Sequence, residues 1–368
     1  MKQIIVLVLS VCMGLIVTGS PVFAEELSNY ELTRKINELE QKVGIRDFSG
    51  QWMDRISISG LLEVEGVYED QDNRDGTGED SSDLNLATVE LGIDAEFNDY
   101  VSGHVVFLWE EDDTEPVDLD EGYITLTPSP NWPVYFSAGK LYVPFGNFET
   151  HMVSDPLTLE LGETRESAAV AGLEQNGFYA SAYAFNGDVD KFDDDSHVDN
   201  FGASAGYRIA ADAFSLDAGV GYINNILDSD GLEDFLSDEG IDAVDDYVGG
   251  VTAHAIFSSG PVTFIGEYMT ALDDTGYTDN GNIMEMEEIS AWNLELGYGF
   301  TLAEKDTTLA VGWQGTDDAG GFLAEDRYIC AMSMDVFDHT SVALEYFHEE
   351  YENDDENDAV TAQLAFAF

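Results

Sequence analysis

The sequence is poor in cysteine, proline and positive charge. Its 368 residues include two cysteines, Cys12 and Cys330, and eight prolines. Only 13 lysines and arginines stand against 75 aspartates and glutamates, which gives a formal net charge of −62. Disordered acidic chains are poor in aromatic residues, but 12% of this chain is aromatic. The acidic residues are therefore expected to decorate a folded protein, and no nucleic-acid partner is expected.

A long apolar run is missing after the first residues. Residues 2–24 begin with a lysine, continue with an apolar core and end in small residues at Ala24, which predicts a secretory signal peptide over 1–24. A lipoprotein signal is disfavoured because Val11 directly precedes Cys12. Removal of the signal leaves Cys330 alone, which excludes an internal disulfide. Without a run of about 18 apolar residues, helical membrane spans are excluded.

The segment after the signal has helical periodicity. Leu32, Ile36, Leu39 and Val43 are spaced 4, 3 and 4 in a polar segment, which predicts a periplasmic coiled-coil helix over 25–44. Such a seam would support a homotrimer. The alternative is a helix that lies on its own domain. A linker is expected at 45–55.

From Ile56 to Phe368 the hydrophobic period is two, and sixteen such segments follow one another. A soluble sandwich would share this alternation. The connections decide between the two folds, because short and long ones alternate strictly, as in outer-membrane barrels. The terminal Phe368 also resembles a signal read by the outer-membrane assembly machinery. The sequence therefore predicts an all-β, 16-stranded antiparallel transmembrane β-barrel over 56–368, in the outer membrane of a Gram-negative cell.

Acidic residues concentrate in the long connections and on one phase of the strands. The eight long connections, the first of them expected at 69–83, hold 49 of the 75 acidic residues. In a barrel the polar phase faces the lumen, so a cation-favouring lumen is expected. The alternative for the loop acids is solubility and weak bridging of divalent cations to outer-membrane lipid. The predicted lumen acids are Glu63, Glu65, Glu90, Asp94, Glu96, Asp217, Glu267, Glu295 and Glu345.

The third long connection, residues 142–166, is too apolar for an exposed loop. We expect it to fold into the lumen and form a constriction, with an externally folded cap as the alternative. Arg165 is a lone base among carboxylates there. It is predicted to anchor the loop, and the alternative is contact with a passing anionic group. The predicted constriction residues are Phe145, Glu149, Asp155, Glu160, Glu163, Arg165 and Glu166.

Motifs for metal binding and catalysis are missing. The six histidines are scattered without ligand spacing, and no acidic loop has the calcium-loop pattern. No nucleophile elbow, P-loop or dinucleotide fingerprint is present. We therefore expect no metal centre, no cofactor and no enzymatic activity.

The run GKLYVPFGNFETHMVSDPLTLELGETRESAAVAGLE from Gly139 to Glu174, followed by NGFYASAYAFNGD, resembles the siderophore porin family typified by the legiobactin receptor, the LbtU-type porins. The run Asp120 to Ile124 is similar to that family too. The resemblance implies an amino-terminal coiled coil, a sixteen-stranded barrel and passive uptake of an iron chelate without a plug domain.

Three functions therefore remain in view. The first is a porin for passive uptake of small hydrophilic solutes, siderophores or other metal chelates included. A general or cation-selective diffusion porin is the second, and a non-conducting structural or adhesive barrel is the third. A phosphate-type porin needs lumenal lysines, and only seven bases follow Arg55.

Overall fold

The structure is a computed structural model that describes residues 55–111, 118–129, 131–192, 197–238, 240–241, 243–279, 282–319 and 322–368. The predicted signal peptide at 1–24, the helix at 25–44 and almost all of the linker at 45–55 lie outside these residues and stay predictions.

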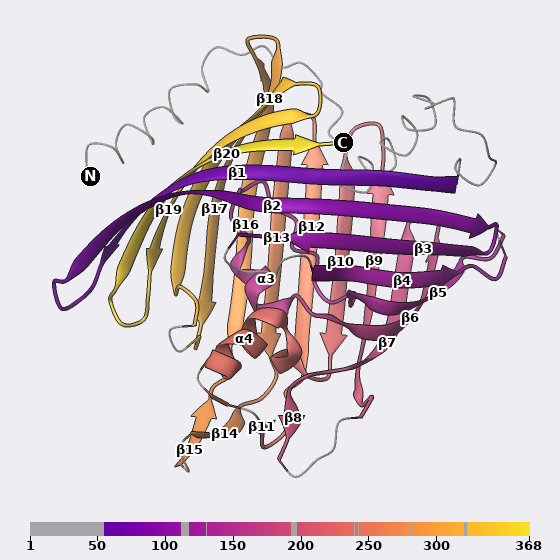
Figure 1. The fold of residues 1–368 in the computed structure, drawn as a ribbon, viewed down its shortest axis with the longest axis horizontal. Coiled ribbons are helices and arrows are strands. Elements are labelled where there is room, and N and C mark those ends of the chain that lie inside the picture. The colour runs from indigo at the N-terminus through magenta and orange to yellow at the C-terminus, as the bar shows by residue number, and fades with distance from the viewer. Residues whose placement is uncertain are drawn as a thin grey trace.

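Sixteen strands close into one barrel in which every neighbouring pair is antiparallel (Figure 1). They are β1 (Ile56–Asp72), β2 (Gly78–Asn98), β3 (Val101–Trp109), β4 (Asp118–Leu126), β5 (Val134–Tyr142), β6 (Arg165–Gln175), β7 (Phe178–Asn186), β9 (Asn200–Ala210), β10 (Ser215–Ile223), β12 (Gly250–Ser259), β13 (Val262–Ala271), β16 (Ser290–Leu302), β17 (Lys305–Asp317), β18 (Asp326–Phe337), β19 (Thr340–Glu350) and β20 (Glu356–Ala367). The predicted fold class is confirmed.

The long connections carry further elements at one end of the barrel, here called the loop end; the opposite end is the turn end. Helix α3 (Leu157–Gly162) follows β5, and η3 (Ile226–Asp228) and α4 (Asp230–Asp238) follow β10. A small sheet of order β15-β14-β11-β8 also forms from the loops, at the bottom of Figure 1. Its strands are β8 (Asp190–Lys191), β11 (Ala243–Val244), β14 (Thr275–Asp279) and β15 (Asn282–Met286).

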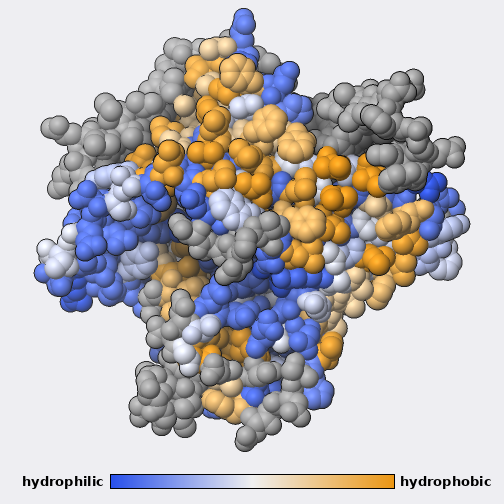
Figure 2. Space-filling view, viewed as in Figure 1, coloured by the Kyte–Doolittle hydropathy of each residue, from blue (hydrophilic) through white to orange (hydrophobic). Residues whose placement is uncertain are grey.

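The strands form because apolar and polar residues alternate along them. On β13, Phe264 and Tyr268 are 40% and 49% exposed, while Ile265 and Glu267 between them are 2% and 4% exposed. Successive side chains of a strand point to opposite faces, so the large exposed residues lie on the outer wall. Apolar side chains gather over the strands in Figure 2, and hydrophilic ones cover the loop end around α4.

The barrel closes between the first and last strands. Leu61 of β1 pairs with Ala367 of β20, and Gly60 and Phe368 exchange two backbone hydrogen bonds of 3.0 Å. The ring of Phe368 lies against Gly60, where a Cβ would come within 2.6 Å of it. Closure satisfies the backbone groups of both edges, which an apolar environment requires.

The first long connection is shorter than expected. The sequence places a loop at 69–83, but β1 continues to Asp72, β2 begins at Gly78, and Gln71 pairs with Glu79. Both faces of this hairpin tip are acidic, so hydrophobic alternation stops before the backbone pairing does.

Candidate functional site: the inner loop and the passage beside it

Residues 143–164, here called the inner loop, lie inside the barrel, where α3 is seen in Figure 1. Glutamates from three strands accept hydrogen bonds from this loop: Glu267 of β13, Glu295 of β16 and Glu345 of β19. Since these glutamates are on the inward phase, the loop rests on the inner wall and does not form an external cap. They are 4%, 2% and 1% exposed.

Each of these carboxylates binds its own short piece of the loop. Glu267 accepts the N–H groups of Asn147 at 2.8 Å and Phe148 at 3.0 Å. The Glu295 carboxylate accepts the Thr150 hydroxyl at 2.6 Å and the His151 N–H at 2.8 Å. Glu345 accepts the Val153 N–H at 2.5 Å, the Ser154 N–H at 3.1 Å and the Ser154 hydroxyl. Charge-assisted bonds of this kind are the strong class, so the three glutamates clamp the loop.

Sequence reasoning assigned Glu267, Glu295 and Glu345 to the open lumen. They do face inward, but the inner loop covers them, so they hold the loop instead of lining the pore. The sequence signal that could have pointed to this role is the loop itself, because the polar residues 147–154 must find hydrogen-bond partners once they are placed inside the barrel.

Apolar residues fix the other side of the loop. Phe145, Leu157 and Leu161 are at most 1% exposed. Phe145 and Leu161 share one core with residues 224–249, here called the covering loop, from which Ile226, Leu227, Leu232 and Leu236 contribute side chains that are at most 2% exposed. The N–H of Asp230 bonds to the carbonyl of Glu163 at 2.8 Å, which joins the two loops. The predicted burial of the loop's apolar residues is therefore seen, with a second loop as an unexpected partner.

Arg327 of β18 is an anchor that sequence reasoning missed. Its Nη1 donates to the carbonyl oxygen of Asp155 at 2.9 Å, and its Nε and Nη2 lie 2.7 and 2.6 Å from Oε1 of Glu349. A guanidinium held on one carboxylate has a fixed direction, so it can position a loop carbonyl. No pattern in the sequence marks a base so far from the loop.

Arg165 joins strands and loops at the loop end of β6. Its Nη1 lies 2.5 Å from Oδ1 of Asp120, which also accepts the Tyr142 hydroxyl at 3.0 Å. The Arg165 N–H donates to Asp230 at 2.9 Å. These contacts connect β4, β5, β6 and α4, and they favour the predicted anchor over a direct contact with solute.

Carboxylates of the inner loop and of the first two strands lie within electrostatic range of one another. Asp155 is exposed on the loop, and its charge acts on Glu63 and Glu65 of β1. Glu90 of β2 adds to the field at Glu63. These four residues, Glu63, Glu65, Glu90 and Asp155, are here called the acidic passage. Negative charge stands on both sides of it.

The remaining predicted residues are dispersed. Glu149 is half-buried near His151 and His254, Glu160 lies in α3 beside Gly231, and Glu166 is 9% exposed at the start of β6. Asp94 is 2.6 Å from Nδ1 of His104, Asp217 binds Arg208, and Glu96 is exposed at the turn end of β2. The structure therefore does not bring all the predicted acids to one constriction.

Glu163 directly follows α3, and its pKa lies above neutrality. Burial is the main cause that raises its pKa from 4.5 to about 8, and the charges of Asp230, Asp155 and Asp120 add to it. The unfolded chain ionises near the ordinary value. The raised pKa therefore stabilises the fold fully below pH 4.5, and this contribution is lost as the pH rises through about 8.

Glu163→Gln is expected to reduce the pH dependence of ion selectivity. In the native protein, the inner loop gains one negative charge as the pH rises through about 8, so cation preference should increase between pH 7 and 9. The glutamine variant should show a flatter profile in reversal-potential measurements. Identical profiles for the two proteins would contradict a titration of Glu163 in this range.

Within the described ranges, no three His, Cys, Asp or Glu residues are arranged to hold a metal ion. None of the described helices is long and apolar enough to cross a membrane. Cys330 is buried, with 7% exposure, and forms no disulfide with another described residue.

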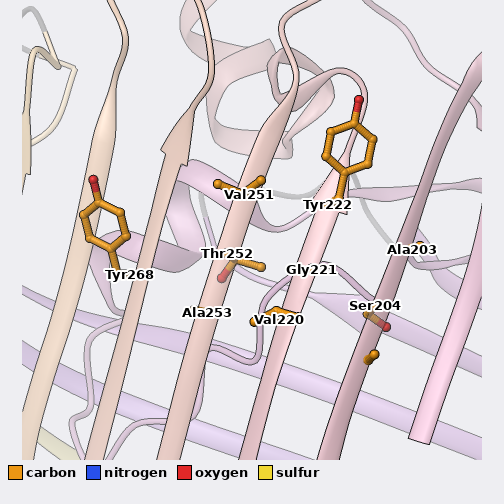
Figure 3. A pocket seen from close by; sticks show the side chains of 10 residues that line it. Ala203, Ser204, Val220, Gly221, Tyr222, Val251, Thr252, Ala253 and Tyr268 are labelled. Atoms are coloured by element: carbon orange, nitrogen blue, oxygen red, sulfur yellow. The ribbon is translucent and has the colours of Figure 1, made fainter.

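A hollow of about 580 Å³ lies on β9, β10, β12 and β13, outside the lumen. Figure 3 shows Ala203, Val220 and Ala253 in it, with Tyr222 and Tyr268 on either side of Val251. Val220 is 59% exposed, which places the hollow on the outer wall.

No family model matches this chain. A UPF0422 protein of Coxiella burnetii is 28% identical over 307 residues, which cover 81% of this chain and 64% of the relative. The UPF0422 protein lpp3030 of Legionella pneumophila strain Paris is 24% identical over 345 residues, 86% of this chain and 62% of the relative. This chain therefore spans less than two thirds of the length of these relatives.

Solved structures with the same fold are outer-membrane porins and channels. The channel DcaP of Acinetobacter baumannii has a TM-score of 0.59 and 17% identity, and the match covers 85% of this chain and 97% of that one. An anion-selective porin from Comamonas acidovorans has a TM-score of 0.57 and 11% identity, with 85% and 99% covered. Pseudomonas putida OprB has a TM-score of 0.57 and 10% identity, with 94% and 100% covered. The chain has a porin fold.

Proposed function

We propose that this protein is an outer-membrane diffusion porin that favours cations. The observation that carries the proposal is the acidic passage, in which Asp155 on the inner loop is opposed by the β1 carboxylates Glu63 and Glu65. A low-dielectric wall strengthens the field of such groups and raises the local concentration of counter-ions. The porin fold supports the outer-membrane location.

The solutes are proposed to be small and hydrophilic, with metal chelates among them. The resemblance of residues 139–174 to siderophore porins supports iron chelates, and this segment supplies the inner loop itself. Chelates that are neutral or carry positive charge fit the acidic passage, whereas strongly anionic chelates would be repelled.

A salt gradient across a planar bilayer tests the proposal. The purified protein should form channels whose reversal potential favours potassium over chloride, and the preference should weaken at 1 M salt, where the screening length is about 3 Å. Preference for chloride would refute the role of the acidic passage. Folding of the purified protein is checked by the change in its gel mobility on heating. Folded protein that gives no conductance would instead support a structural barrel.

A further inference from the structure

We infer that Tyr135 and Glu174 form a binding site for organic cations, of the guanidinium or amine class, at the turn end of the lumen. This inference rests on the proposed cation preference and names a class of solute for it. Tyr135 is the second residue of β5, and Glu174 is the last but one of β6. A solute that has crossed the acidic passage would meet this site next.

Six neighbouring strands contribute one inward residue each to a continuous band at this level. Glu174 is paired with Tyr179 of β7 in the strand register, and Asp217 of β10 with Arg208 of β9. The Nε2 atom of His254, from β12, lies 3.2 Å from the Tyr179 hydroxyl. The band thus runs from Tyr135 to His254 without a gap in strand order.

One cation, the guanidinium of Arg208, is already bound within this band. The guanidinium of Arg208 lies 4.2 Å from the centroid of the Tyr179 ring. Its Nε donates to Asp217 at 2.7 Å, and Asp217 in turn accepts the Tyr179 hydroxyl at 2.9 Å. A tyrosine face and a carboxylate therefore hold one guanidinium, which combines a cation–π contact with a charge-assisted hydrogen bond.

Tyr135 and Glu174 provide the same two kinds of group, a tyrosine ring and a carboxylate, on the adjacent strands β5 and β6. The Tyr135 ring covers Gly172, where a Cβ would come within 2.2 Å of Cζ, so the ring lies along the inner wall. Glu174 contacts Arg208 only at 3.8 Å, and 54% of its side chain is exposed. The carboxylate is therefore open to a second cation, beside a ring that lies on the wall.

Arginine amide is a suitable probe because it carries a guanidinium and no carboxylate. Added to potassium chloride at constant ionic strength, it should reduce single-channel current with a measurable half-blocking concentration. Tyr135→Leu should raise that concentration about two- to fivefold, the factor expected for loss of one exposed cation–π contact. Tyr135→Phe keeps the ring and should leave it unchanged, and Glu174→Gln should raise it as well.

Tyr207→Leu is the matched control, because Tyr207 is a tyrosine of β9 whose side chain is 48% exposed on the outer wall. It should leave the block unchanged. Block by arginine amide that is equal in the native protein and Tyr135→Leu would overturn the inference. If Tyr135→Leu does not fold, Gly172→Ala gives a second test, because its new methyl must displace the ring; unchanged block there also counts against the site.

Failure of this inference is distinguishable from failure of the proposed function. Potassium-over-chloride preference depends on the acidic passage and should be the same in Tyr135→Leu and the native protein. A native channel that prefers potassium but is not blocked by arginine amide refutes the organic-cation site alone. A native channel without cation preference refutes the proposed function.

Discussion

Glu345→Ala is expected to release the centre of the inner loop and to raise the single-channel conductance and the size limit for solutes. The substitution removes the acceptor of two backbone N–H groups and of the Ser154 hydroxyl. A donor left without a partner costs about 1–3 kcal/mol, so three lost bonds cost at least about 3 kcal/mol. We expect this cost to exceed the packing energy of the half-buried residues at this point of the loop. The loop should therefore leave the inner wall at Val153 and Ser154.

The measurement is conductance, current noise and liposome swelling with sugars of increasing size. Glu345→Gln keeps one acceptor oxygen and the shape of the side chain, so its effect should be intermediate. Glu96→Ala is the matched control, since Glu96 is an exposed glutamate at the turn end of β2. If Glu345→Ala behaves like this control, the loop is held by Arg327 and the apolar core, and the clamp contributes little.

The barrel could be predicted from the sequence because its physics is repeated. Each strand must present apolar residues to one side, and the connections at one end of the barrel must be short. The same pattern therefore occurs in all sixteen segments. One local reading can fail without changing the count. The extension of the β1–β2 hairpin to Asp72 and Gly78 is such a failure, since its acidic tip has no apolar face to mark.

The contacts inside the barrel could not be predicted in the same way. Glu63 and Glu345 have the same residue type and the same inward phase, but one belongs to the acidic passage and the other is covered by the inner loop. The difference arises from where a folded loop comes to rest, and periodicity carries no information about that. Arg327 is hidden for the same reason, because it lies 172 positions from the carbonyl that it holds.

The amino-acid composition around Arg165 predicts that it forms an ion pair but does not identify the partner. A single base among carboxylates predicts an ion pair, and the ion pair with Asp120 is present. Composition does not name the partner, and it does not reveal that the covering loop supplies Asp230 on the other side. Both partners come from segments that are remote in sequence and adjacent only in the closed barrel.

Replacing Asp155 and Glu63 together by lysine is expected to shift the channel from cation preference toward anion preference. Each substitution changes the local charge by two units. Two unit charges about 4 Å apart in water interact with an energy of about 1 kcal/mol. The combined change should alter the potassium-to-chloride permeability ratio by at least about tenfold at low salt. Since dissolved ions screen charges, the shift should shrink as the salt concentration rises.

The same exchange placed elsewhere shows whether position matters more than net charge. Glu96→Lys combined with Asp118→Lys changes the total charge by the same amount, at the turn end of β2 and the loop end of β4. This control should shift the permeability ratio much less. Equal shifts in the two double variants would mean that the whole acidic surface sets the selectivity, and the acidic passage would then have no special part in it.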